Sequence, residues 1–188
     1  MKKSKPYSFT LILKNVDEKT ENLEDSLYEA NCDDALIQFK HGAVYLEFNR
    51  KATSLEEAVI SAIKDVQSCT LEADIASIAP ENFVTESEIA KRLEISRQTV
   101  SLWIKGKRRK FFPQPIMRLA EKSSLWKWNE VCIWLYENKI ITNKNLVEDA
   151  LFFSNMSAAL EERDSKAREI RHHLLQRISV NECAKRSR

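Results

Sequence analysis

Glycine is scarce in this chain, with only Gly42 and Gly106 among 188 residues. A phosphate-binding loop of the kind found in nucleotide enzymes needs several glycines close together, so that its backbone N–H groups can approach the ligand. The composition excludes such a loop. No pair of carboxylates at a defined spacing and no Ser/His/Asp set is visible either, so we expect no enzyme activity, no catalytic residue and no cofactor.

Cysteines are few and widely spaced. Cys32, Cys69, Cys132 and Cys183 form no C-x-x-C pair and have no histidine at ligand spacing, which predicts reduced thiols and no metal site. No apolar run approaches the roughly 20 residues that a transmembrane helix needs, and the apolar stretch after the basic start is too short for a signal peptide. We therefore expect a soluble cytoplasmic protein with no membrane partner.

Charge is nearly balanced over the whole chain, at +2, but it is unevenly distributed. Residues 1–80 carry a net charge of −5, residues 81–140 carry +5 and residues 141–188 carry +2. A surface that binds the phosphate backbone of a nucleic acid must be basic. The segment 81–140 is therefore the candidate for nucleic-acid contact, and the acidic first 80 residues are poorly suited to it.

The segment 85–110 predicts two helices joined by a short turn. Thr85 and Glu88 have the spacing of a capping box, which satisfies two free N–H groups at the start of a helix. Two helices that cross closely need a small residue at the crossing point, and Ala90 provides one. Val100 and Trp103 have the spacing that lets the second helix cover it.

This segment resembles the helix-turn-helix of bacterial and phage transcription regulators. Ala90, Ile95, Val100 and Trp103 match the small residue, the apolar turn residue and the two apolar recognition-helix positions of that pattern. The family usually has glycine where this chain has Glu94. Because a left-handed backbone is strained for other residues, this difference predicts a turn of different shape. The alternative interpretation is a plain helical hairpin inside a core.

The side chains that face outward from the second helix suit a major groove, because arginine fits guanine, glutamine fits adenine and hydroxyls contact either bases or phosphates. We predict base contacts by Ser96, Arg97, Gln98, Thr99 and Ser101. Gly106 then stops the helix, and a run of cations follows, for which a solvated face is the alternative. We predict phosphate contacts with double-stranded DNA by Thr85, Lys105, Lys107, Arg108, Arg109 and Lys110.

The segment after the cations cannot be helical at 111–116, because it contains two prolines. A short strand at 124–128 and a helix capped by Asn129 are expected next. Together with the helix-turn-helix, this region resembles the excisionase and MerR-like winged-helix regulators at Phe112, Pro113, Pro115, Trp126, Trp128, Val131, Trp134 and Leu135. The resemblance implies a two-stranded wing and a third helix behind it. Arg118 and Lys122 would lie on the wing, near a phosphate or the minor groove.

Residues 1–80 predict the order β-α-β-β-α-β, which is that of ferredoxin-like domains. The expected elements are strands at 7–14, 35–40, 43–49 and 72–78, a hairpin at 41–42, a helix at 21–30, and a helix opened by a capping box of Ser54 and Glu57. RNA-recognition motifs share this order. Only Tyr45 stands at a base-stacking position, however, so RNA binding is not expected. Dimerisation, a protein partner and a small effector remain open roles for this domain.

Residues 141–188 predict helices at 145–153 and 157–178. Leu160, Ala167, Ile170 and Leu174 lie on a seam of alternating three- and four-residue steps that passes through position 163, with Ala159 beside it, as in a helix that packs on another. Arg163 interrupts that seam. Folding back on the body and pairing with a second subunit both remain open.

The sequence therefore predicts an α+β protein with three parts: a ferredoxin-like domain at 1–80, a winged helix-turn-helix at 81–140 and C-terminal helices at 141–188. The predicted function is that of a sequence-specific DNA-binding transcriptional regulator, acting as a homodimer on a repeated site. The alternatives are a protein-interaction adaptor, such as an antitoxin or phage-defence partner, and an architectural factor of the excisionase kind that bends DNA.

Overall fold

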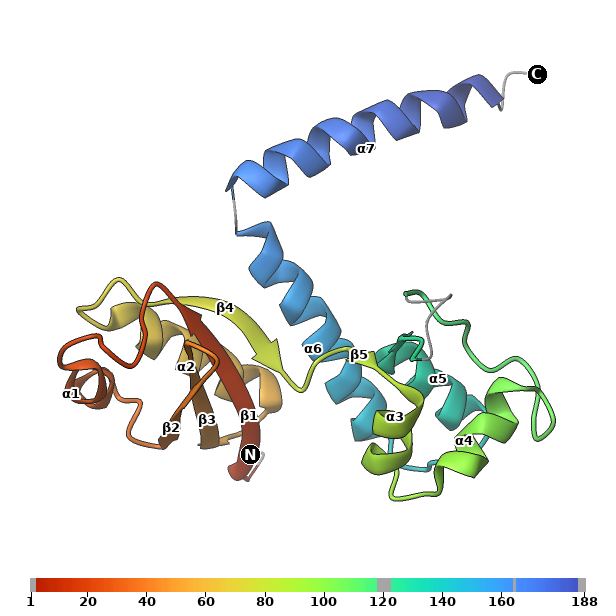
Figure 1. Cartoon of the computed structure of the whole chain (residues 1–188), viewed down its shortest axis with the longest axis horizontal. Helices are drawn as coiled ribbons and strands as arrows, with labels where there is room; N and C mark the ends of the chain where they lie inside the picture. Colours follow the sequence, from red (N-terminus) through yellow and green to blue (C-terminus); the bar gives the residue numbers. More distant parts are fainter. Residues whose placement is uncertain (1–2, 118–122, 164, 186–188) are drawn as a thin grey trace.

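The computed structural model describes residues 3–117, 123–163 and 165–185. It has a mixed α+β structure, as the sequence predicts. Figure 1 shows two units, an antiparallel sheet with two helices and a mainly helical unit, with helix α6 (Lys144–Glu162) between them. Helix α7 (Ser165–Lys185) extends away from both units (Figure 1).

The sheet unit has the predicted order β-α-β-β-α-β. Its elements are β1 (Lys5–Lys14), α1 (Leu23–Glu29), β2 (Ala35–Lys40), β3 (Ala43–Ala52), α2 (Leu55–Ser68) and β4 (Asp74–Ala79). The strands lie in the order β2-β3-β1-β4, and each neighbouring pair is antiparallel. The predicted hairpin is confirmed at His41 and Gly42, both of which have positive φ, as a two-residue type I′ turn requires.

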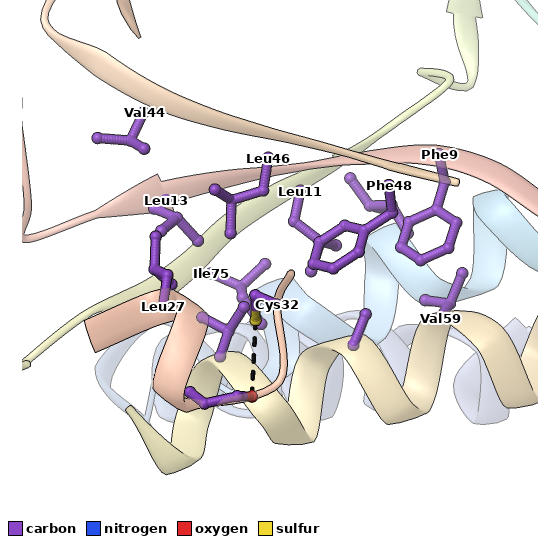
Figure 2. Packing of buried hydrophobic residues seen from close by; sticks show 14 of the residues in the cluster. Phe9, Leu11, Leu13, Leu27, Cys32, Val44, Leu46, Phe48, Val59 and Ile75 are labelled. Atoms are coloured by element: carbon purple, nitrogen blue, oxygen red, sulfur yellow. Dashed lines mark hydrogen bonds between the residues drawn. The ribbon is translucent and has the colours of Figure 1, made fainter. Parts of the chain in front are cut away.

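The core of this unit lies between the sheet and its two helices. Alternate residues of β1 and β3 are buried there as three cross-strand pairs, Phe9–Phe48, Leu11–Leu46 and Leu13–Val44. Figure 2 shows their side chains on the side of the sheet where Val59 of α2 and Leu27 of α1 lie. The alternation along β1 and the apolar stripe of α2, whose buried residues include Ala58, Val59 and Ala62, thus face the same core.

The capping box predicted for α2 is only half formed. Ser54 Oγ accepts a hydrogen bond from the Glu57 N–H at 3.1 Å, as expected. The Glu57 carboxylate does not reach back to Ser54; it accepts instead from the N–H of Thr53, at 3.0 Å, and from the Thr53 hydroxyl. Thr53 offers two donors to one carboxylate, which accounts for the difference.

Arg50, on β3, is buried although it is charged. Its guanidinium donates to both carboxylate oxygens of Asp34, at 2.9 and 2.8 Å, to the carboxylate of Asp65 and to the carbonyl of Asn31. Burial by itself would lower the pKa of Arg50, but the hydrogen bonds to the two carboxylates outweigh it and raise that pKa. Arg50 thus joins β3 to α2 and to the loop before β2.

The helical unit contains β5 (Phe83–Val84), α3 (Glu86–Arg92), α4 (Arg97–Ile104), β6 (Trp126–Lys127) and α5 (Trp128–Glu137). β5 pairs with β6 in antiparallel fashion. The segment 111–116 is not helical, as its prolines predict. The strand expected at 124–128 is shortened to two residues, since α5 already begins at Trp128.

The prediction that Asn129 caps α5 is wrong. Asn129 lies in the first turn of the helix, and its N–H donates to Oδ1 of Asn82 at 3.1 Å. The N–H of Trp128 donates to the carbonyl of Asn82 at 2.6 Å. The cap therefore comes from the segment that joins the two units, 47 positions earlier in the chain, and a local sequence pattern cannot reveal it.

The C-terminal helices also differ from the prediction, because α6 runs without a break through the expected gap at 154–156. α6 packs on both units: Ala150 belongs to the buried cluster of the helical unit, and Phe153 belongs to that of the sheet unit. This two-sided burial keeps the helix continuous. Arg163, the C-cap of α6, pairs with Asp74 of β4 at 3.1 Å. In the part of the chain described here, no helix could cross a membrane.

Candidate nucleic-acid interface

Helix α3 begins at a capping box, as predicted. Thr85 Oγ1 accepts from the Glu88 N–H at 3.2 Å, and the Glu88 carboxylate accepts from the Thr85 N–H at 2.6 Å. The bond from the Thr85 N–H lowers the pKa of the Glu88 carboxyl. The Thr85 hydroxyl, for which we predicted a phosphate contact, is thus engaged in fixing the start of the helix.

The turn between α3 and α4 is left-handed at Glu94, where φ is 54°. The N–H of Ile95 donates to the carbonyl of Ala90 at 3.0 Å, and the N–H of Glu94 donates to that of Lys91 at 3.2 Å. These are the two bonds of a Schellman motif. The expected change of conformation at Glu94 is therefore not observed, because the two bonds hold this exposed residue in the conformation that glycine favours.

The crossing of the two helices is packed as predicted. Ala90, Val100 and Trp103 are buried in one cluster. Because α4 buries Val100 and Trp103 against α3 and α5, its opposite face is left to solvent. Gln98 and Lys105 are exposed on that face, seven positions apart, and the half-buried Ser101 lies between them in the sequence.

The other predicted base contacts lie at the start of α4. Ser96 Oγ accepts from the Thr99 N–H at 3.2 Å and lies 2.9 Å from Thr99 Oγ1. Arg97 is exposed, and its Nε lies 3.5 Å from Oε1 of Glu86 on α3. The Ser96 hydroxyl thus caps the helix, and the Thr99 hydroxyl is bonded to it. Arg97 and Gln98 remain as the long, exposed polar side chains of this end.

The cations that follow α4 form an exposed segment that is held to the rest of the unit. Gly106, with φ of 63°, ends the helix as predicted. Residues 107–110 are all exposed, and within the described chain no carboxylate pairs with Lys107, Arg108 or Lys110. Arg109 differs, since its Nη1 donates to the carbonyl of Asn138 at the end of α5, at 3.0 Å. We refer to residues 105–111 as the basic segment.

An aromatic cluster supports the basic segment. Its members are Trp103, Phe112, Trp126 and Trp134, with ring centroids 4.9 to 6.4 Å apart. The indole N–H of Trp134 donates to the carbonyl of Lys110, and that of Trp126 donates to the carbonyl of Pro113, both at 3.1 Å. The backbone is therefore fixed on both sides of Phe111.

Sequence reasoning missed two exposed apolar residues at this surface. Leu102 lies on the outward face of α4 between Gln98 and Lys105, and Phe111 is 91% exposed at the end of the basic segment. The helical spacing of Leu102 was available as a signal. The exposure of Phe111 was not, because the resemblance involves Phe112 and indicates no environment for Phe111.

Arg92 is a further residue that the sequence did not single out. Its guanidinium lies 5.1 Å from the ring centroid of Trp128, and its Nη2 donates to the carbonyl of Glu81 at 3.1 Å. Burial lowers the pKa of Arg92, although Glu81 and Glu88 act in the opposite direction. Arg92 thus ties α3 to α5 and to the segment before β5.

Of the segment predicted to form the wing, the structure describes only the residues up to 117 and from 123 onward. The N–H of Ile116 donates to the carbonyl of Leu125 at 2.8 Å, and the N–H of Leu125 donates to that of Met117 at 3.1 Å. The two predicted wing cations, Arg118 and Lys122, lie outside the described residues.

The described thiols are buried, at Cys32, Cys69 and Cys132. Burial raises the pKa of Cys32 and of Cys132 to about 12, even though Arg50 and Arg92 act in the opposite direction. A protonated, buried thiol is a poor nucleophile and a poor metal ligand. In the part of the chain that the structure covers, no group of three or more His, Cys, Asp and Glu side chains is placed to hold a metal ion.

No protein-family model, curated protein or solved structure matches this chain. Any functional conclusion must therefore come from the arrangement of α3, α4 and the basic segment.

Proposed function

We propose that this protein is a sequence-specific DNA-binding transcriptional regulator that inserts α4 into the major groove. One observation carries the proposal: the exposed polar face of α4 continues directly into the exposed cations of the basic segment. A helix that reads bases needs such an outward face, and its affinity comes from cations beside it that meet the phosphates. A helical hairpin buried in a core would need neither.

In this proposal each α4 side chain contacts the base that its chemical groups fit. Arg97 hydrogen-bonds guanine and Gln98 hydrogen-bonds adenine, each in a bidentate manner, and Leu102 contacts a thymine methyl group. Ser101, whose side chain is shorter, contacts a base or a phosphate through its hydroxyl. Ser96 caps α4 through its hydroxyl, which also contacts the hydroxyl of Thr99; both residues lie where a helix N-terminus approaches a base edge or a phosphate.

The phosphate contacts fall to Lys105, Lys107, Arg108 and Lys110, whose charges are unpaired within the described chain. Each phosphate that is neutralised steepens the dependence of log affinity on log salt by about 0.9. Thr85 and Arg109 support the interface by fixing α3 and the basic segment, because Thr85 caps α3 and Arg109 donates to the carbonyl of Asn138.

We assign the helical unit to the winged helix-turn-helix folds and the sheet unit to the ferredoxin-like folds. The strand order β2-β3-β1-β4 with antiparallel neighbours supports the second assignment. The pairing of Met117 with Leu125 supports a wing that begins there. Such a regulator works in the compartment that holds the chromosome, which is the cytoplasm for the bacterial regulators that the segment resembles.

We also propose a homodimer, because regulators of this kind bind repeated half-sites with two copies. α7 offers a contact surface: Ile170, Leu174 and Ile178 recur every fourth residue, and they are 62%, 49% and 61% exposed. Replacing all three by serine is expected to give a monomer in sedimentation equilibrium, where the unaltered chain sediments as a dimer. A wild-type chain that stays monomeric would remove the dimer from the proposal.

The test of DNA reading uses the full chain and duplexes enriched from a random pool. Anisotropy titrations over a range of salt compare the wild type with Arg97→Ala/Gln98→Ala. Arg168→Ala/Gln176→Ala, which removes the same two residue types from α7, is the matched control. We expect the wild type and the control to prefer the enriched duplex, and the α4 variant to keep only weak, salt-sensitive binding. Equal preference in all three proteins would refute base reading by α4.

A second candidate function is that of a protein-interaction adaptor, and one observation favours it. β2 is an edge strand of the acidic unit. Leu36 on β2 is 61% exposed, and Tyr28 on α1 is 70% exposed. An open strand edge can pair with a strand of another chain. This candidate predicts a stable complex that survives Arg97→Ala/Gln98→Ala and is lost on Leu36→Lys.

A further inference from the structure

Phe111 and Phe112 are neighbours in the sequence with opposite environments. Phe112 packs edge-on against Trp134, with ring centroids 4.9 Å apart. Phe111 is 91% exposed, more than any other large apolar residue of the described chain. Its side chain contributes almost nothing to the core, so a role in folding does not account for it.

The surrounding structure holds Phe111 outward. The Lys110 carbonyl is bound by the indole of Trp134, and Phe112 is enclosed by the aromatic cluster. Between these two anchors Phe111 takes a φ of 59°, and Arg109, directly before the first anchor, takes a φ of 72°. A bulky aromatic residue rarely adopts this left-handed region, and such strain persists only where the neighbouring structure imposes it.

The position of Phe111 relative to charge indicates what it meets. It directly follows the cations of residues 107–110, on the segment that leaves the C-terminal end of α4. A segment that runs from a helix in the major groove across one phosphate backbone arrives at the adjoining minor groove. Minor-groove proteins insert apolar side chains between base pairs there and kink the duplex.

We propose that Phe111 is an apolar wedge that enters the minor groove beside the α4 site and partly unstacks one base step. The inference rests on the proposed function and adds a source of specificity to it. Pyrimidine–purine steps unstack most easily, so Phe111 selects for such a step at a position that no polar side chain reads. The exposed cations before it supply the affinity that offsets the distortion.

The experiment places 2-aminopurine, whose fluorescence rises on unstacking, at each position in turn along one flank of the enriched duplex. The full-length wild type is compared with Phe111→Ala and Phe111→Leu. Tyr28→Ala, which removes a similarly exposed aromatic ring from the sheet unit, is the matched control. Thermal unfolding followed by circular dichroism verifies that all four proteins fold alike.

We expect a fluorescence rise at one step with the wild type, with Phe111→Leu and with Tyr28→Ala. Phe111→Ala should abolish the rise and weaken binding about tenfold, the scale of one lost stacking contact. If the wild type binds the duplex and Phe111→Ala matches it in fluorescence and affinity, the wedge is refuted while the proposed function stands. If the wild type binds no duplex, both are refuted.

Discussion

The side-chain amide of Asn82 donates to the hydroxyl of Ser154 at 3.0 Å, across 72 positions of the sequence. The same side chain accepts from the Asn129 N–H at the start of α5. Asn82 therefore joins the segment between the units to α5 and α6. Because α6 contributes buried residues to both units, this contact lies where the helical unit is fixed to the rest of the chain.

Asn82→Ala is expected to lower the free energy of unfolding by about 1–2 kcal/mol, the scale of a lost helix cap and one further hydrogen bond. Urea unfolding followed by circular dichroism measures it. Asn155→Ala, which removes an exposed asparagine from α6, is the control and should change stability by less than about 0.5 kcal/mol. Equal effects of the two substitutions would contradict the role of Asn82.

Arg50→Ala should be far more damaging, because it leaves the carboxylates of Asp34 and Asp65 without their shared partner. Removing one member of a fully buried ionic network costs about 3–5 kcal/mol, and because the two carboxylates are 32% and 27% exposed we expect the lower end of that range. Chemical denaturation at neutral pH provides the measurement, with the exposed neighbour changed in Lys51→Ala as the control. A loss below 1 kcal/mol, on the order of a surface substitution, would show that the two aspartates find other partners.

Glu94 and Gly106 make a matched pair, since both follow a helix with positive φ. Glu94→Gly is expected to raise the free energy of unfolding by about 0.5–1 kcal/mol, because glycine adopts this conformation without strain. Gly106→Ala is expected to lower it by a similar amount. Thermal unfolding of both variants tests the prediction, which fails if the two shifts in melting temperature have the same sign.

The buried thiols make stability depend on alkaline pH. Burial raises the pKa of Cys32 and Cys132 to about 12 in the folded chain, and an unfolded thiol has a pKa of about 8.5. The stabilising contribution is complete below the unfolded value and is lost as the pH rises toward about 12, because only the unfolded chain then releases these protons. Urea titrations between pH 8 and pH 10.5 should show this decline.

Cys32→Ala/Cys132→Ala is the control for that titration, and its stability should decline less steeply over the same range. Maleimide labelling at pH 8 with peptide mapping provides an independent measurement. Both cysteines should resist labelling in the folded chain and react in urea. Rapid labelling of either thiol in the folded chain would contradict its burial.

Much of the local structure was determined by the sequence alone. The alternation of Phe9, Leu11 and Leu13, the apolar stripe of α2 and the capping box of Thr85 all depend on residues no more than a few positions apart. Their periodicity and spacing follow from strand and helix geometry, so these features can be recognised from the sequence without tertiary structure. The same holds for the crossing of α3 and α4, because Ala90, Val100 and Trp103 belong to helices joined by one short turn.

Tertiary structure alone decided the features whose partners are distant in the sequence. Asn82 caps a helix that starts 46 positions later, at Trp128, Arg50 is buried because Asp34 and Asp65 converge on it, and α6 continues because two units pack on it. Phe111 and Phe112 show the difference most plainly. They are adjacent in the sequence, but hydrogen bonds from two distant indoles to the carbonyls of Lys110 and Pro113 fix the backbone on both sides, with Phe112 in the aromatic cluster and Phe111 in solvent.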